Sequence, residues 1–327
     1  MKPNIFELAT KELSQDAFFT WLLSYADESN KEHNEELSAC AKDFISCLSS
    51  NQLLPQDIKK VEAGRQWDNI DIWAVINDKI LIIIEDKTNT KQHNNQLERY
   101  KEIAKKDCQE NNYQELFCIY LKTGAESQAS INDVEKQGFS IIGIEDLLNI
   151  FNKYDIKNDI FNDFHTSLQQ IYEGQKSFEN KLIKEWDWAN WQGFYTYLDS
   201  TINVNGWGYV SNPSGGFLGL WWHGHQKDNY WVGLQIESKS GRLCFKMWAD
   251  SNQAEYKNEW HSIIMAKTAA ENKNEIIRPK VLRSGKSMTV AIVERKDWLG
   301  ADDIKINKEA VVSKLKDYEK FLDSCIS

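Results

Sequence analysis

One short segment constrains the fold of this chain more than any other: an aliphatic run that ends abruptly in three charges. Residues 80–84 read ILIII, and Glu85, Asp86 and Lys87 follow them directly. A run that is apolar on both faces is typical of a central strand in a covered sheet. Charge buried beside such a strand is costly unless it is paired or bound to a metal. The charged triplet therefore needs a chemical explanation.

The segments around this run predict an α/β domain built on a mixed sheet. Amphipathic periodicity predicts helices over residues 8–26 and 35–48 and, with Thr90 as N-cap, over 90–106. Strands are predicted over 61–67, 70–76, 79–85, 116–121 and 139–144, with a tight turn at Asn77-Asp78 and helices again from residue 145. This order of elements describes a mixed central sheet flanked by helices on both sides.

The composition changes near residue 174, which predicts two domains. Residues 1–174 carry a net charge of −12, whereas residues 175–327 carry +2 and hold ten of the 13 tryptophans. We expect the second to be a smaller α+β domain with an antiparallel sheet. Its elements are predicted as helices over 178–191, 255–271 and 308–324 and strands over 216–223, 230–237, 242–248 and 288–294, with one more strand before the last of these.

Charge, hydropathy and cysteine usage restrict the partners and the compartment. The total charge of −10 gives no bulk attraction to nucleic acid or anionic membranes, so such a partner needs a local basic patch. The longest aliphatic run is far shorter than the roughly 20 apolar residues of a membrane helix, and the first residues lack a secretory signal. The six cysteines form no CxxC pair. We expect a cytoplasmic protein with reduced thiols and no membrane partner.

The charged triplet and the preceding strand offer a set of groups suited to metal-dependent chemistry. Side chains alternate along a strand, so Glu85 and Lys87 share one face while Asp86 points to the other. Asp71 lies in the neighbouring strand and reaches the same face if the turn at Asn77-Asp78 sets the register. Two carboxylates can hold Mg²⁺, and an ammonium beside them can orient a nucleophile or neutralise an oxyanion. This combination is what phosphodiester hydrolysis needs.

At these positions the sequence resembles the PD-(D/E)XK nuclease superfamily, whose signature is an acid on one strand and (D/E)-x-K on the next. Gln96 and Tyr100 are similar to the Q-x-x-x-Y element of its RecB-like and λ-exonuclease-like branches. The resemblance covers about residues 4–150 and implies a restriction-endonuclease-like fold, with Mg²⁺ or Mn²⁺ as cofactor. It implies that Asp71, Glu85 and the backbone carbonyl of Asp86 hold the metal and that Lys87 orients the attacking water.

The first helix carries a further likeness to this superfamily, through an acidic motif whose carboxylate completes the metal site. Glu12 and Asp16 are four residues apart and share a helical face, so spacing does not choose between them. The resemblance favours Glu12 and leaves Asp16 as the second candidate. Many relatives carry His and Ser where this chain has Gln15 and Asp16, so the match is partial.

Each of these residues also has a purely structural interpretation. Glu85 and Lys87 could form a surface ion pair, which is common and contributes about 0–1 kcal/mol. Tyr100 could be a core residue and Gln96 a solvated one, and an acid in a first helical turn is favoured by the helix dipole. Arg65, before the acidic strand, could contact a phosphate or pair with Asp68.

The second half contains weaker signals for ligand binding. The densest basic stretch of the chain, formed by Arg278, Lys280, Arg283 and Lys286, predicts either a phosphate-contacting arm or a solvated edge strand. Adjacent Trp221 and Trp222 should point to opposite faces of a strand, and exposed tryptophans could stack on bases. His223 and His225 could share a strand face as metal ligands do, but without an evident third ligand a polar strand end is the preferred interpretation.

These signals together predict a metal-dependent nuclease. The resemblance implies DNA as its substrate and a role in bacterial defence against phage or in DNA processing. Gln96 and Tyr100 would position the substrate, and the C-terminal domain would serve recognition or assembly, including any homo-oligomer or protein partner. The alternative is a sensor or binding protein in which the nuclease fold is catalytically inactive or becomes active only after a trigger, because a fold can be retained after its catalytic function is lost.

Overall fold

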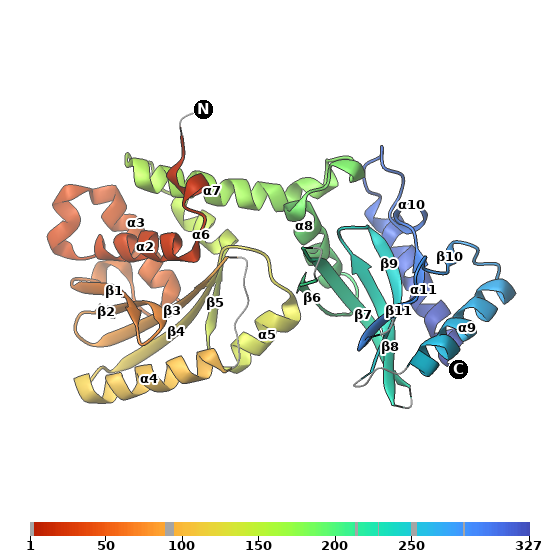
Figure 1. Cartoon of the computed structure of the whole chain (residues 1–327). Coiled ribbons are helices and arrows are strands. Elements are labelled where there is room, and N and C mark those ends of the chain that lie inside the picture. Colours follow the sequence, from red (N-terminus) through yellow and green to blue (C-terminus); the bar gives the residue numbers. More distant parts are fainter. Residues whose placement is uncertain (1–2, 89–94, 213–214, 228, 250–253, 284) are drawn as a thin grey trace. The chain divides into compact units, whose positions relative to one another are not determined.

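The computed structural model describes residues 3–88, 95–212, 215–227, 229–249, 254–283 and 285–327, without the side chains of residues 254 and 255. The N-cap predicted at Thr90 lies outside these residues. The chain divides into two compact units, one formed by Met1–Ala125 with Ser130–Glu173 and the other by Glu126–Ala129 with Gly174–Ser327 (Figure 1). In the described part of the chain, no helix has the length and apolar character needed to cross a membrane.

The first unit contains the predicted mixed sheet. Its strands follow the order β1-β2-β3-β4-β5, antiparallel from β1 to β3 and parallel from β3 to β5. Their bounds are β1 Val61–Trp67, β2 Ile70–Ile76, β3 Ile80–Lys87, β4 Glu115–Lys122 and β5 Ser140–Gly143. Every residue of β3 is buried, which confirms that it is a central strand. The strand also continues two residues further than predicted, because β4 pairs with it up to Lys87.

Helices cover both faces of this sheet (Figure 1). They are α1 Ile5–Leu8, α2 Glu12–Ser24, α3 Glu35–Leu48, α4 Gln96–Asn111, α5 Gln128–Lys136, α6 Ile144–Phe151 and α7 Asp159–Lys176, with 3-10 turns η1 Glu28–His33 and η2 Pro55–Asp57. Helices α2, α3, α6 and α7 pack in one core cluster with Ile82 and Ile84, while α4 packs in the other with Leu81 and Ile83. The alternation along β3 therefore gives its terminal charges two different surroundings.

The predicted helix over residues 8–26 is wrong in one respect, because it is interrupted. Ala9 and Lys11 have non-helical backbone angles, so α1 ends at Leu8 and α2 begins at Glu12. Asn4 caps the short first helix, since its side chain accepts a hydrogen bond from Phe6 N at 2.8 Å. The interruption places Glu12 in the first turn of α2.

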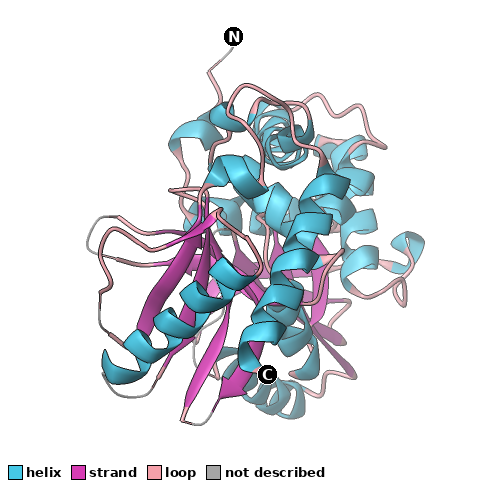
Figure 2. Ribbon diagram, turned by 90° about the vertical axis from the view of Figure 1, so that its right-hand side faces the viewer, coloured by secondary structure: helices cyan, strands magenta, loops and turns pink. Residues whose placement is uncertain are grey.

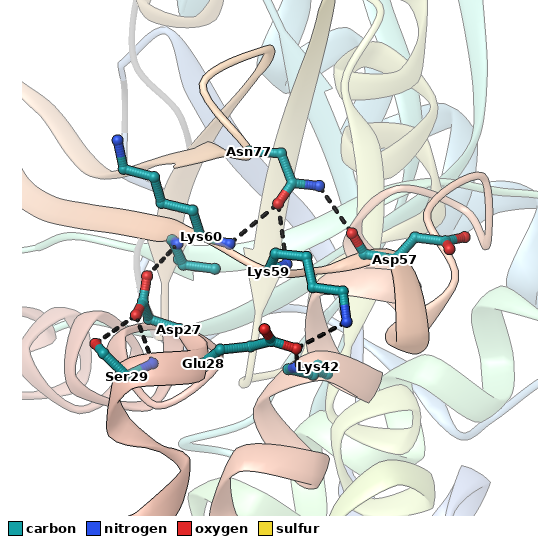
Figure 3. A network of polar contacts seen from close by, with 9 residues as sticks. Asp27, Glu28, Ser29, Lys42, Asp57, Lys59, Lys60 and Asn77 are labelled. Atoms are coloured by element: carbon teal, nitrogen blue, oxygen red, sulfur yellow. Dashed lines mark hydrogen bonds and ion pairs between the residues drawn. The ribbon is translucent and has the colours of Figure 1, made fainter.

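The hairpin that joins β2 to β3 is anchored by the side chain of Asn77 (Figure 3). Its Oδ1 accepts from the backbone N–H groups of Lys59 and Lys60 at 2.9 and 3.1 Å, and its Nδ2 donates to Asp57 O at 2.9 Å. Asn77 also has a left-handed backbone with φ 53°, which Asn tolerates better than most residues. The turn pairs Ile76 with Ile80, and this register continues toward the ends that carry Asp71 and Glu85.

We expect Asn77→Ala to lower the free energy of unfolding by about 2 kcal/mol, because it removes three hydrogen bonds and puts alanine in a left-handed conformation. Urea denaturation measures the change. Asp57→Ala is the matched control, since Asp57 accepts through its backbone carbonyl, which the substitution retains. Equal stability of both variants would show that the Asn77 bonds do not hold the hairpin.

The second unit is built on a six-stranded antiparallel sheet with the order β10-β11-β9-β8-β7-β6, as the predicted fold class requires. The strands are β6 Val204–Val210, β7 Phe217–Lys227, β8 Tyr230–Glu237, β9 Arg242–Trp248, β10 Ile276–Ile277 and β11 Ser287–Val293. The helices are α8 Trp188–Asp199, α9 Ala254–Ala270, α10 Arg295–Trp298 and α11 Lys308–Ile326. Figure 2 distinguishes the strands and helices of both units by colour.

In this unit one prediction needs correction and one strand was missed. The helix expected over 178–191 is replaced by the 3-10 turns η3 Ser177–Glu179 and η4 Ile183–Glu185, and α8 begins only after the capping residue Asp187. Strand β6 was not predicted, because its two glycines conceal the strand pattern. The opposite orientation of Trp221 and Trp222 is confirmed: Trp222 is buried and donates to Glu319 Oε1 on α11 at 2.9 Å, whereas Trp221 is half-buried.

Candidate active site

The charged residues at the end of β3 meet the acid of β2. The Nζ atom of Lys87 contacts Glu85 Oε1 and lies 3.5 Å from Asp71 Oδ2. Asp71 Oδ2 also accepts from the backbone N–H of Asp86 at 3.1 Å, which joins the ends of the two strands. The structure thus brings together the acid and the E-x-K triplet that the sequence singled out, on the side of the sheet that α4 covers.

This ion pair is buried, so the interpretation as a surface pair is wrong. The side chain of Glu85 is 0% exposed and that of Lys87 is 10% exposed. Burial, and after it the carboxylate of Asp71, raises the pKa of Glu85 to about 8. The carboxyl group therefore favours a bound proton or a neighbouring cation near neutral pH.

Lys87 stays positively charged despite its burial. Loss of solvation acts to lower its pKa, but Glu85 and then Asp71 and Glu12 act in the opposite direction, and the pKa rises above its ordinary value. An ammonium of this kind holds its proton. It is suited to orienting a nucleophile or neutralising negative charge, and unsuited to accepting a proton in this arrangement.

The side chain of Asp86 lies on the opposite side of β3, among residues of α2. Gln15 Nε2 donates to its Oδ1, and Asp16 shares a hydrogen bond with it. Burial and then Asp16 raise the pKa of Asp86, while burial and then Asp71 raise that of Asp16 to about 6. Gln15 Oε1 in turn accepts from Thr123 Oγ1 at 3.0 Å.

Both candidates on the first helix reach the end of β3, but they have different neighbours. Glu12 Oε1 accepts from Thr88 N at 3.0 Å and interacts electrostatically with Lys87. Asp16 shares a hydrogen bond with Asp86 and also interacts electrostatically with Asp71 and Lys87. Arg65 is exposed on β1, donates to a backbone carbonyl of α2 at 3.2 Å rather than pairing with Asp68, and is near enough to Asp16 to favour its ionised form.

Gln96 and Tyr100 lie on one face of α4, as their spacing predicts. Gln96 Nε2 donates to the hydroxyl of Tyr100 at 2.8 Å. The Tyr100 ring is 2% exposed and packs in the same core cluster as Ile83, while the role of its hydroxyl in positioning substrate stays a prediction. Gln96 is half-buried at the start of the helix, not fully solvated. This pair is on the same side of the sheet as Glu85.

Sequence reasoning missed the residues that support this strand end from β4. Thr123 N donates to Lys87 O at 3.2 Å, and the Thr123 hydroxyl contacts Gln15. A Cβ atom at Gly124 would overlap the backbone carbonyl of Thr88. The position of Thr123-Gly124 could have indicated this contact. These residues directly follow a strand parallel to β3, and parallel strands end at the same edge of a sheet.

Carboxylate oxygens at the end of β3 are candidate ligands for a divalent cation. Among the described residues, Glu85 Oε2 is buried without a hydrogen-bond donor on the side of β3 that α4 covers. The buried oxygens Asp16 Oδ1 and Asp86 Oδ2 lie on the α2 side, where these two carboxyl groups share a hydrogen bond. Buried carboxylate oxygens without a donor are costly unless a cation or proton compensates them. A set made only of hard oxygens is the kind that Mg²⁺ and Mn²⁺ prefer over softer metals.

A mixed sheet whose central strand ends in E-x-K beside an acid of the preceding strand defines the restriction-endonuclease-like class of proteins. A model of the PD-(D/E)XK nuclease superfamily matches residues 3–203, more than half of the 327 residues, and the chain belongs to this superfamily. The match continues through α8 and ends just before β6. No curated protein and no solved structure matches the chain. The RecB-like or λ-exonuclease-like branch stays a prediction.

The basic stretch of the second unit lies between β10 and β11. Arg278, Lys280, Arg283 and Lys286 are all exposed, and none forms an ion pair with another residue that the structure describes. Lys286 also lines a cavity together with Trp231 and Trp248. Cationic and aromatic side chains therefore occur side by side on this unit.

Proposed function

We propose that the protein is a metal-dependent nuclease that hydrolyses phosphodiester bonds, with DNA as the favoured substrate. The cluster of Asp71, Glu85 and Lys87 is the observation that carries this proposal, because it places two carboxylates around a lysine that keeps its charge, and among the described residues one buried oxygen of Glu85 has no hydrogen-bond donor. Membership of a superfamily of nucleases supports the same conclusion.

In this proposal the carboxylates of Asp71 and Glu85 hold the cation, with help from Glu12 and the backbone carbonyl of Asp86. Bound there, Mg²⁺ or Mn²⁺ would lower the pKa of a water molecule and stabilise charge on the phosphate. Lys87 keeps its proton and orients the attacking water by donating to it. Asp16 remains the second candidate from the first helix.

We infer a division of labour in which residues 1–174 carry the chemistry and residues 175–327 serve recognition or assembly. The net charge of −12 on residues 1–174 repels the phosphate backbone of DNA, so binding requires positive charge from elsewhere in the protein. The exposed side chains of Arg278, Lys280, Arg283 and Lys286, the last of which lines a cavity with Trp231 and Trp248, supply charge and stacking surfaces that single-stranded nucleic acid uses. A cytoplasmic role in defence or DNA processing agrees with this assignment.

A cleavage assay tests the proposal. Linear and circular, single- and double-stranded DNA and RNA are incubated with the protein in Mg²⁺, in Mn²⁺ and in EDTA. We expect cutting of DNA that requires the metal, and the panel separates endonuclease from exonuclease action. Absence of cutting together with absence of Mn²⁺ binding would refute the nuclease assignment.

A binding or sensor protein is the second candidate, and the aromatic and basic cavity of the second unit favours it. In that case nucleic acid or another ligand binds at Trp231 and Trp248 in EDTA, and the nuclease fold cuts nothing on any substrate. Metal binding without cleavage would instead indicate an enzyme that awaits a trigger or partner.

We expect Tyr100→Phe and Gln96→Ala to lower kcat/KM by about 10-fold or more, because each removes a polar group proposed to position the phosphate. Tyr100→Phe keeps the ring in the core, so its stability should change little. Steady-state cleavage kinetics measure the effect. Gln109→Ala, on an exposed position of the same helix, is the control and should match the wild type.

A further inference from the structure

We propose that His223, His225 and Asp323 form a second metal site, distinct from the carboxylate cluster, that takes Zn²⁺ or a similar transition-metal ion. The two histidines belong to β7 and the aspartate to α11, all within the second unit. The sequence offered no third ligand for the histidine pair, because Asp323 is 100 residues away from His223.

The distances among the donor atoms fit one small ion. Asp323 Oδ1 lies 2.8 Å from His223 Nε2 and 3.3 Å from His225 Nε2, and the three ligand atoms all lie within 4.8 Å of one another. Donors bound tetrahedrally to zinc at about 2.0–2.2 Å are separated by about 3.3 Å. The Nε2 atom of His225 is buried and has no hydrogen-bond partner among the described residues. It is therefore an available ligand directed into the cluster.

The backbone of β7 is distorted where the histidines occur. Pairing with β8 is irregular between Trp222 and His225, and His223 has a left-handed conformation with φ 52°. Such a conformation is unfavourable for a residue with a side chain and is concentrated at binding and active sites. The irregularity re-aims a side chain in the way that β-bulges do. The strained backbone at His223 thus lets the imidazoles of His223 and His225 both reach the carboxylate of Asp323.

The opposing helix is held in place by independent contacts. Trp222 Nε1 donates to Glu319 Oε1 at 2.9 Å, one helical turn before Asp323. Phe245 of β9 packs edge-on against Tyr318 and Phe321 of the same helix. These contacts fix α11 over the sheet, so the carboxylate of Asp323 does not depend on the histidines for its position.

The donor set selects a different metal from the first site. Two imidazole nitrogens and one carboxylate oxygen suit zinc and its neighbours, whereas Mg²⁺ prefers oxygen alone. Three protein ligands leave at least one coordination position open, as in zinc sites that bind water or a small ligand. The histidines line a cavity together with Asn205, Lys316 and Glu319, which gives such a ligand access.

Isothermal titration of the full chain with Zn²⁺, and visible absorption with Co²⁺, test this site. We expect His225→Ala and Asp323→Asn each to weaken binding at this site by at least about 100-fold, since even outer partners of metal ligands contribute 10–100-fold. The Co²⁺ absorption of a low-coordinate site should disappear in the same variants. His33→Ala, an exposed histidine of the first unit, should bind as the wild type does.

Two results would overturn the proposal. Wild-type Zn²⁺ affinity in both variants would place the metal elsewhere, and absence of any Zn²⁺ or Co²⁺ binding would reduce the cluster to an ion pair between histidine and aspartate. Circular dichroism verifies that the variants are folded, and Asp323→Asn, on an exposed helix face, is the milder substitution. Glu85→Gln should leave the cobalt spectrum unchanged, which separates this site from the carboxylate cluster.

Discussion

Replacing Lys87 by alanine should lower the rate of cleavage by about 100-fold or more in the presence of saturating Mg²⁺ or Mn²⁺. Removing one donor that stabilises developing charge in an enzyme site typically costs about 10²–10³ in kcat. Lys87 is the ammonium that contacts Glu85 and lies near Asp71, and its raised pKa keeps it charged. Single-turnover cleavage of the preferred substrate measures the chemical step without product release.

Without metal, the Lys87→Ala variant should be less stable than the wild type, because the substitution leaves buried carboxylates without their positively charged partner. Removing one partner of a buried pair costs about 3–5 kcal/mol unless the remaining group takes up a proton. Activity is therefore compared at a metal concentration that restores wild-type stability. Lys106→Ala, on an exposed position of α4, is the matched control. Full activity of the Lys87 variant would remove the lysine from the mechanism.

Glu85→Gln should abolish metal-dependent cleavage and, in EDTA, make the stability of the protein less dependent on pH. The folded-state pKa of Glu85 is raised to about 8 from an ordinary value of 4.5. A raised pKa favours folding while the group is protonated, so its contribution is complete below about pH 4.5 and is lost as the pH rises through about 8. Glutamine stays neutral throughout. We expect the loss of wild-type stability between about pH 5 and 8 to be absent in the variant, whatever constant cost the unpaired Lys87 adds.

Urea denaturation between pH 5 and 9, with EDTA or with Mn²⁺, measures this prediction. Wild-type protein should lose stability with rising pH in EDTA and recover it with Mn²⁺, because the ion binds only the folded site. The stability of the Glu85→Gln variant should neither fall with rising pH in EDTA nor increase with Mn²⁺. Glu102→Gln, at an exposed position of α4, should keep the wild-type profile. An unchanged pH dependence in Glu85→Gln would show that Glu85 is not the group that titrates.

The core of this site could be predicted because its parts are close in sequence. Asp71 and Glu85 are separated by one hairpin, and the Asn77-Asp78 turn that sets their register is itself visible in the residue types. Alternation along the strand then assigns each charge to a face. The fold of the first unit followed from the same local signals.

The remaining features depend on contacts that no local pattern records. Gln15 and Asp86 are 71 residues apart, and Thr123 is 108 residues from Gln15. Their packing selects which side chain of α2 faces which strand, so the choice between Glu12 and Asp16 could not be made from spacing. In the second unit a helix is predicted over 178–191, but the backbone there forms two 3-10 turns before Asp187 caps α8.

The close approach of Gly124 to the carbonyl of Thr88 affects how this protein can be studied by mutation. Alanine scanning removes atoms at almost every position, but at a glycine it adds one. Here the added methyl group would push against the backbone one residue beyond Lys87. Loss of activity in a Gly124→Ala variant would therefore indicate a displaced strand end, not the loss of a contact. The contribution of Gly124 is the space that it leaves for the backbone of Thr88.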